Sequence, residues 1–169
     1  MYYINCFFVY SFIGFLFENA VSKITGNNFE SGILYGPFTP IYGIGVILIL
    51  VLSKYFFLNL HLPRWKETIV VFFLLIIVLT FIEWIGGVLI EWLFGVTFWN
   101  YEKFKFHIGK YIALEISLVW GFLSLLLIYV IHPFLDNIIK KIPNFVTWSF
   151  VILIILDFIC TFIKYKFRN

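Results

Sequence analysis

The sequence predicts an all-α, polytopic helical membrane protein with about five transmembrane helices. Of its 169 residues, 63% are hydrophobic, 23% are aromatic and only 12% are charged. A soluble domain averages about 45–50% apolar and about 25% charged residues, and a water-soluble fold of this size lacks the interior to bury so much apolar surface. At roughly 20 residues for each span, the chain has no room for a sizeable domain outside the bilayer.

We expect one membrane domain over residues 1–169. Hydropathy and helix-breaking residues place the spans at about residues 3–22, 41–58, 69–94, 111–131 and 145–163. The fourth span is expected to stop at His132-Pro133, because proline disfavours helix in the residue before it. No Lys or Arg precedes Lys23, so the first span lacks the positive region of a cleaved signal and should stay in the mature protein.

A Gly/Pro-rich segment at about residues 26–45 precedes the second span and overlaps its start. Two prolines three residues apart cannot lie inside an unbroken helix without freeing carbonyl groups. Non-helical backbone at membrane depth occurs only where protein or a water-filled cavity satisfies it. The segment is therefore either a re-entrant or broken helix that lines a pathway, or a plain surface turn. The candidate pathway residues are Tyr35, Gly36, Pro37, Pro40, Tyr42 and Gly43.

A second unusual segment, at about residues 95–110, mixes aromatic side chains with lysines. Aromatic rings and lysines together are typical of the headgroup layer of a membrane, which predicts an interfacial loop. The candidate residues of this loop are Trp99, Asn100, Tyr101 and His107.

Five acidic residues fall inside predicted spans, where a charged side chain costs about 2.5–3.5 kcal/mol at the centre. These acids are either protonated or line a wet cavity with partners; those near helix ends, such as Asp157 and Glu115, can also reach the interface. Near Gly86 and Gly87 a neighbouring helix can approach closely, so this region is either a packing notch or a polar half-channel. The candidate polar site contains Glu18, Glu83, Glu91 and Glu115.

The distribution of basic residues favours a cytoplasmic C-terminus. Five spans put seven of the 12 Lys and Arg residues on the C-terminal side and five on the other side. The seven are Lys23, Lys103, Lys105, Lys110, Lys164, Lys166 and Arg168, and the five are Lys54, Arg64, Lys66, Lys140 and Lys141.

Most enzyme signatures are missing from the sequence. No G-x-x-x-x-G-K-[ST] loop and no H-E-x-x-H pattern occurs, so we expect neither ATP binding by a P-loop nor a catalytic zinc site. No cofactor and no metal is expected, and the modest net charge of +3 does not suggest a nucleic-acid partner. A transport role would therefore need energy from elsewhere, such as a separate ATPase subunit.

Four stretches together resemble the small bacterial membrane proteins labelled putative ABC-transporter type IV, or CmpB-like permeases. They are YSFIGFLFEN (10–19), GILYGPFTPIYGIG (32–45), EWIGGVLIEWLFGVTFWNY (83–101) and SLVWGFLSLLLIYVIHP (117–133). This chain departs from the family pattern at Asn100, where members often have Asp, and at His107, where they often have Asn. Glu115 has no clear family counterpart. The resemblance implies a permease-like protein of the bacterial cytoplasmic membrane.

The leading hypothesis is a small permease-like transport component with an acid-lined polar site in one leaflet. The bilayer is its environment, and a homo-oligomer or the separate ATPase subunit would complete the pathway. Two alternatives stay open: an intramembrane lipid-modifying enzyme or flippase, and a structural or regulatory membrane subunit.

Overall fold

The computed structural model describes residues 1–25, 32–55 and 62–167. Residues 26–31 of the predicted Gly/Pro segment and residues 56–58 of the predicted second span lie outside the described residues. The chain divides into two compact units, one formed by Met1–Val46 with Ile138–Asn169 and the other by Ile47–Asn137.

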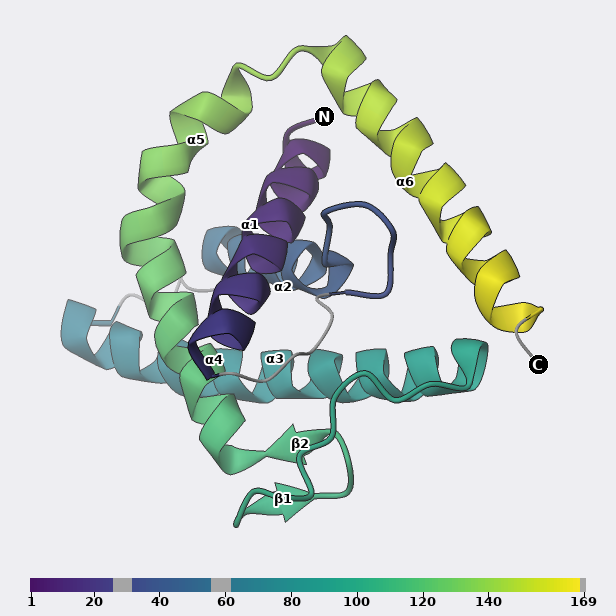
Figure 1. Ribbon diagram of the computed structural model, residues 1–169. Helices are drawn as coiled ribbons and strands as arrows, with labels where there is room; N and C mark the ends of the chain where they lie inside the picture. Colours follow the sequence, from purple (N-terminus) through teal and green to yellow (C-terminus); the bar gives the residue numbers. More distant parts are fainter. Residues whose placement is uncertain (26–31, 56–61, 168–169) are drawn as a thin grey trace. The chain divides into compact units, whose positions relative to one another are not determined.

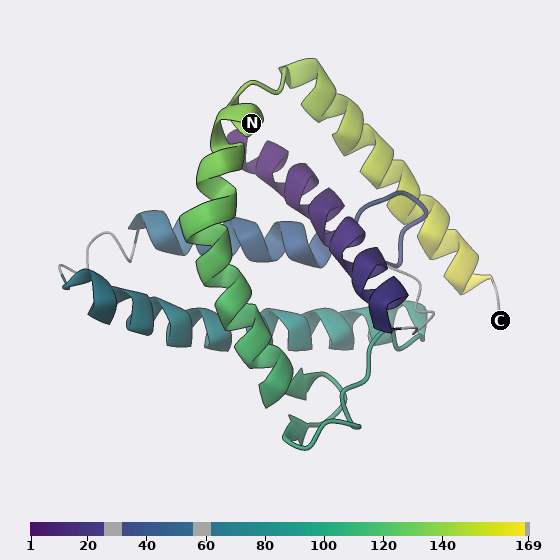
Figure 2. The same ribbon diagram turned by 60° about the vertical axis from the view of Figure 1, so that its left-hand side comes forward.

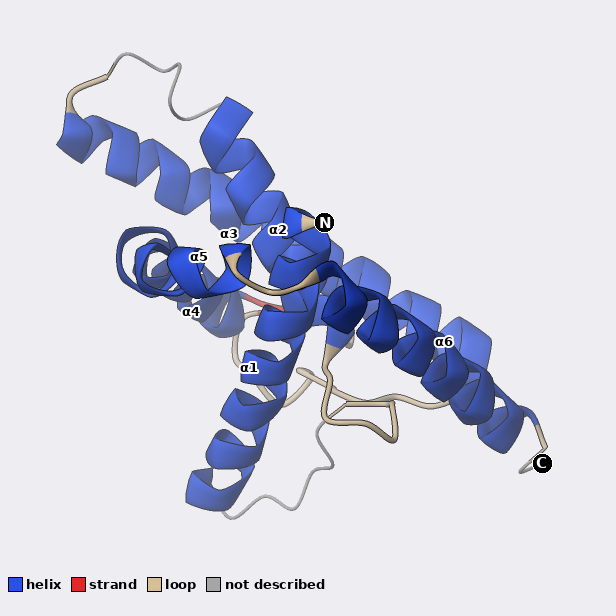
Figure 3. Ribbon diagram, turned by 90° about the horizontal axis from the view of Figure 1, so that it is seen from above, coloured by secondary structure: helices blue, strands red, loops and turns tan. Residues whose placement is uncertain are grey.

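Helix dominates the described residues, and strand is confined there to one short hairpin (Figure 3). Within residues 1–25, 32–55 and 62–167, four helical stretches are long and apolar enough to cross a membrane, and α2 is shorter, with 16 residues. The predicted all-α membrane protein is thereby confirmed. The helices are α1 (Tyr2–Thr25), α2 (Pro40–Tyr55), α3 (Arg64–Phe94), α4 (Leu114–Leu126) continued by the π-turn η2 (Leu127–Ile131) and α5 (His132–Lys140), and α6 (Asn144–Lys166) (Figure 1; Figure 2).

In the first unit, a buried polar pair joins α1 to α6. The hydroxyl of Thr147 donates to Oδ1 of Asn5 at 2.5 Å, and Nδ2 of Asn5 donates to the carbonyl of Ile139 at 3.4 Å. The rings of Phe8, Phe38 and Phe150 form a cluster, with centroids 5.5 to 5.9 Å apart, and Phe8 and Phe150 each follow a member of the pair by three residues. The cluster joins α1, the segment before α2, and α6.

In the second unit, α3 and α4 pack antiparallel. Thr80 donates to Ser117 at 2.7 Å, and a Cβ at Gly121 would lie 2.7 Å from side-chain atoms of both Phe72 and Ile76. Small residues let helices approach closely where lipid supplies no hydrophobic drive for their association. Ser117 and Gly121 have this role here, and the hydrogen bond of Ser117 to Thr80 joins the start of α4 to α3.

The hairpin lies between α3 and α4 and pairs β1 (His107–Ile108) with β2 (Ile112–Ala113) in antiparallel register. Gly109 adopts a φ of 60° in its turn, a left-handed conformation that glycine reaches without steric penalty. Because Ile112 and Ala113 pair as a strand, the helix begins at Leu114, three residues later than the sequence predicts.

The helix that begins at Leu114 does not stop at His132-Pro133, so the expectation that Pro133 ends it is wrong. His132 has helical φ and ψ of −65° and −44°, and its N–H bonds the carbonyl of Leu127, five residues earlier. A proline in a helix removes one hydrogen bond and clashes with the carbonyl four residues before it. The π-turn shifts the hydrogen-bond register just ahead of Pro133, which allows the helix to continue to Lys140.

Candidate polar site

Glu83 lies on the face of α3 that packs against the rest of the second unit, and only 6% of its surface is exposed. Both of its carboxyl oxygens accept hydrogen bonds. The hydroxyl of Tyr101 donates to Oε1 at 2.6 Å, and Nε1 of Trp120 donates to Oε2 at 2.8 Å. Glu83 thus joins three elements: α3, the loop after it, and α4.

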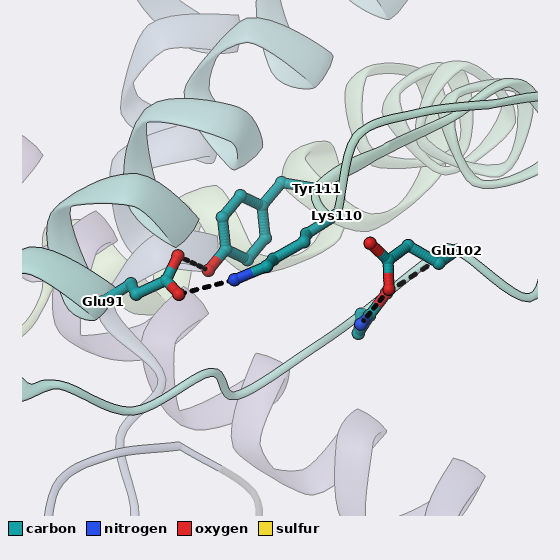
Figure 4. Close-up of polar contacts among 5 residues, drawn as sticks. Glu91, Glu102, Lys110 and Tyr111 are labelled. Atoms are coloured by element: carbon teal, nitrogen blue, oxygen red, sulfur yellow. Dashed lines mark hydrogen bonds and ion pairs between the residues drawn. The ribbon is translucent and has the colours of Figure 1, made fainter.

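Glu91 lies two turns further along α3 and is more accessible, with 39% of its side chain exposed. Lys110 donates to Oε1 at 2.6 Å, and the hydroxyl of Tyr111 donates to Oε2 at 2.7 Å (Figure 4). Gly87 makes this arrangement sterically feasible, because a Cβ there would lie 2.5 Å from Cδ1 of Tyr111. The close approach predicted near Gly86 and Gly87 is made at Gly87 by the ring of Tyr111, from the loop after α3.

The pKa values of the two donors to Glu91, Lys110 and Tyr111, are both raised. The hydrogen bond to Glu91 and its negative charge raise the pKa of Lys110 above the ordinary 10.5. Burial, helped by the hydrogen bond to Glu91, raises the pKa of Tyr111. At neutral pH, Lys110 is therefore a cation and Tyr111 a neutral donor, so Glu91 holds one ionic and one neutral partner.

The loop reaches both acids because it turns back along α3 (Figure 1). Gly95 ends the helix with a φ of 66°, and its N–H bonds the carbonyl of Glu91. The N–H of Tyr101 then bonds the carbonyl of Lys110 at 2.7 Å, and the rings of Trp99 and Tyr111 lie 5.9 Å apart. These contacts hold the donor of Glu83 and the donors of Glu91 on one folded loop.

The remaining predicted residues of this region have local partners. The side-chain amide of Asn100 donates to the carboxylate of Glu102, and its oxygen accepts from the backbone N–H of Glu102, which is labelled in Figure 4. Nδ1 of His107 lies 3.1 Å from the carbonyl oxygen of Gly109. Oε1 of Glu115 accepts a long hydrogen bond of 3.4 Å from the N–H of Phe106. Oε2 of Glu115 and Nε1 of Trp99 are buried and have no hydrogen-bond partner among the described residues.

In the first unit, the described part of the predicted pathway segment is held by Asp157 of α6. One carboxylate oxygen accepts the N–H of Tyr35 at 2.9 Å, and the other accepts the N–H of Gly36 at 2.7 Å. Thr161 donates to the same carboxylate at 3.2 Å, and the ammonium of Lys164 lies 4.8 Å from the ring centre of Tyr35. Two successive backbone N–H groups thus form a small anion-binding concavity that a carboxylate occupies.

The rest of this segment leads directly into α2. Residues 32–39 are not helical, and Pro40 is the first residue of α2, where a missing N–H is tolerated. The ring of Tyr42 packs against Gly14, and Gly43 lies against Ser11. These two glycines permit a close contact between α1 and the first turn of α2.

The structure brings together some of the predicted site residues and not others. Glu83 meets Tyr101 directly, and Glu91 lies on the same helix with its own partners from the same loop. Glu18 is half-buried on α1 and belongs to the first unit. No group of three or more His, Cys, Asp or Glu residues in the described ranges could hold a metal ion.

Four contributing residues are missing from the set that the sequence predicts: Lys110, Tyr111, Trp120 and Asp157. Tyr111 and Trp120 lie 20 and 37 residues from the acids they contact, a separation at which no periodicity links them. Asp157 was recognisable as an acid in a span, but its partners are backbone groups more than 120 residues away.

A family model described as "Putative ABC-transporter type IV" matches residues 5–164, nearly the whole chain. The chain belongs to this family. No curated protein and no solved structure gives a significant match. The family match covers α1 to α6 and therefore includes the surroundings of Glu83, Glu91 and Asp157. With four apolar helices of spanning length, this member of the family is a membrane protein.

Proposed function

We propose that the protein is a permease-like transport component and that Glu83 is the centre of its polar site. The observation that carries the proposal is a carboxyl group buried within a membrane-spanning helix, with hydrogen bonds from Tyr101 and Trp120 to its two oxygens. An ionisable residue inside a span is costly and by default marks a pathway for ions or substrate. The family, described as a putative ABC transporter, supports the same role.

The origin of the two donors suggests how the site acts. Tyr101 belongs to the loop and Trp120 to α4, so a proton or cation that binds Glu83 weakens contacts to two elements at once. Glu91 with Lys110 forms an accessible ion pair two turns further along the same helix. We propose that Glu83 and Glu91 are successive polar positions on α3, one buried and one open to the aqueous side.

The predicted pathway segment and the remaining acids complete the proposal. Residues 32–39 present non-helical backbone next to α2, as expected of a re-entrant or broken helix that offers polar groups to a substrate. Glu18 and Glu115 are proposed as further acids of the pathway. A larger interior is needed than four or five helices supply, and a homo-oligomer or a separate ATPase subunit would provide it. We place the protein in the bacterial cytoplasmic membrane with a cytoplasmic C-terminus, supported by Lys164 and Lys166 in the last turn of α6.

The test compares a deletion strain complemented with the wild type, with Glu83→Gln or with Glu67→Gln, an acid in the first turn of the same helix. Small molecules in cell extracts and medium are profiled by mass spectrometry, and the amount of protein in the membrane is measured in parallel. We expect Glu83→Gln to reproduce the profile of the deletion strain at wild-type abundance, and Glu67→Gln to match the wild type.

Two results would contradict the proposal. If Glu83→Gln is lost from the membrane, the acid is structural. If the deletion instead changes the chemical structure of the lipids, the intramembrane enzyme replaces the transporter. Purification of the wild type in mild detergent, followed by identification of copurifying proteins, tests the ATPase partner.

A further inference from the structure

The hairpin between α3 and α4 exposes an apolar face. Ile108 pairs with Ile112, and the ladder continues where the N–H of Leu114 bonds the carbonyl of Phe106. Cross-strand partners, and residues two apart on a strand, share one face of the ribbon. Phe106 and Ile108 are therefore on the same face as Ile112, and they are 58% and 73% exposed, while Leu114 beside them is 50% exposed.

Ala113 anchors the opposite face of the hairpin, although its cross-strand partner His107 on that face is exposed. Ala113, whose side chain points to that face, is 1% exposed. The hairpin is therefore anchored through Ala113 on one face, and on the other face Phe106, Ile108 and Leu114 are exposed. An exposed apolar patch of this kind marks a site of contact with a membrane or a partner.

Basic residues lie beside this face. The ammonium groups of Lys103 and Lys105 are 5.9 and 5.4 Å from the ring centres of Phe104 and Phe106, and neither pairs with a carboxylate in the described part of the chain. Lys110 is engaged with Glu91. Residues 95–113 contain three lysines and one glutamate, so the segment carries a net charge of +2.

We propose that this hairpin is a docking surface for anionic phospholipid headgroups, defined by Phe106 and Ile108 with Lys103 and Lys105. The segment joins the ends of two spanning helices, which places it at a membrane face. Apolar side chains with adjacent cations fit an interface in which acyl chains lie beside negative phosphates. This surface goes beyond the proposed transport role and does not depend on it.

The test uses the full chain in nanodiscs of phosphatidylcholine alone or mixed with phosphatidylglycerol. An environment-sensitive maleimide dye is attached at Ile108→Cys in a Cys160→Ser background, because Cys160 is exposed and Cys6 is buried. We expect the dye to be quenched by lipids with a quencher in the acyl chain, and to be shielded from acrylamide, an uncharged aqueous quencher, more strongly in the anionic nanodiscs. Each lysine near an anionic surface contributes about fivefold to binding, so Lys103→Gln with Lys105→Gln should reduce this preference by roughly 25-fold.

A matched control is Arg64→Gln with Lys66→Gln at the other end of α3, where an ammonium also lies over a neighbouring ring. It should leave the preference unchanged, and high salt should weaken the preference of the wild type. Equal shielding in both nanodiscs would overturn the assignment to anionic headgroups. A dye open to acrylamide in every lipid mixture would also overturn it and would favour a protein partner for the same face.

Discussion

Removal of the Asp157 carboxylate by Asp157→Ala should release the segment before α2. In the wild type the backbone N–H groups of Tyr35 and Gly36 both donate to this carboxylate, at 2.9 and 2.7 Å. A hydrogen bond to a charged group contributes about 1.5–3 kcal/mol when it is buried. The Gly36 contact is only part-buried and the Tyr35 contact is exposed, so we expect about 2–3 kcal/mol for the two together.

That loss should be visible as faster amide hydrogen exchange. Every 1.4 kcal/mol is a factor of ten in an opening equilibrium, so the amides of Tyr35 and Gly36 should exchange roughly 30- to 150-fold faster. The measurement is hydrogen–deuterium exchange of the protein in detergent, read by mass spectrometry. A peptide within α3 provides the internal reference.

Two variants sharpen the test. Asp157→Asn retains one acceptor oxygen and should give an intermediate rate, whereas Ser149→Ala, which removes only a bond within the same helix, should change nothing at Tyr35. An unchanged rate in Asp157→Ala would show that other contacts hold the segment, and the reasoning from the carboxylate would be wrong.

Two further predictions concern stability. Thr147→Val leaves Oδ1 of buried Asn5 without this donor and should lower the free energy of unfolding by about 1 kcal/mol in a detergent titration. Ser149→Ala is the control. Equal free energies of unfolding in the two variants would contradict a stabilising role for the hydrogen bond between Asn5 and Thr147. Because Glu91 raises the pKa of Lys110, the ion pair should stabilise the fold fully from neutral pH up to pH 10.5 and lose its effect as pH rises through the higher folded value. The difference in unfolding midpoint between the wild type and Lys110→Gln should therefore shrink only above that pH, and a difference that already disappears at neutral pH would contradict the ion pair.

The fold class was predictable because it depends on composition and local pattern. Long apolar runs predict spanning helices wherever they occur, and Pro37 with Pro40 predicts non-helical backbone before α2, as residues 32–39 are. The continuation of the helix through Pro133 was not predictable, because it depends on a π-turn in which the N–H of His132 bonds the carbonyl of Leu127, and no local sequence rule predicts such a turn. Hydropathy and proline rules thus predict where a helix or a break is expected, but they do not predict a helix that continues through a proline.

The sequence was enough to predict the acidic residues of the site, but not the residues that donate hydrogen bonds to them. Glu83 and Glu91 stand out in an apolar span, and Tyr101 was recognised as part of an unusual loop. Only the folded chain shows that the loop turns back along α3, so that Tyr101 and Lys110 reach acids 18 and 19 residues away. Trp120 and Asp157 depend on contacts between distant elements, for which one sequence carries no signal.

The length of α3 links the protein to the thickness of its membrane. Thirty-one residues at about 1.5 Å each give roughly 46 Å, whereas a hydrocarbon core is about 30 Å thick. The helix must therefore tilt strongly or extend about 11 residues beyond the core, the distance from Glu83 to the end of the helix. A thicker bilayer would cover more of the stretch between Glu83 and Glu91, and a thinner one less. Bilayer thickness thus sets how far the accessible Glu91 lies from the hydrocarbon core, while Glu83 remains covered by Tyr101 and Trp120.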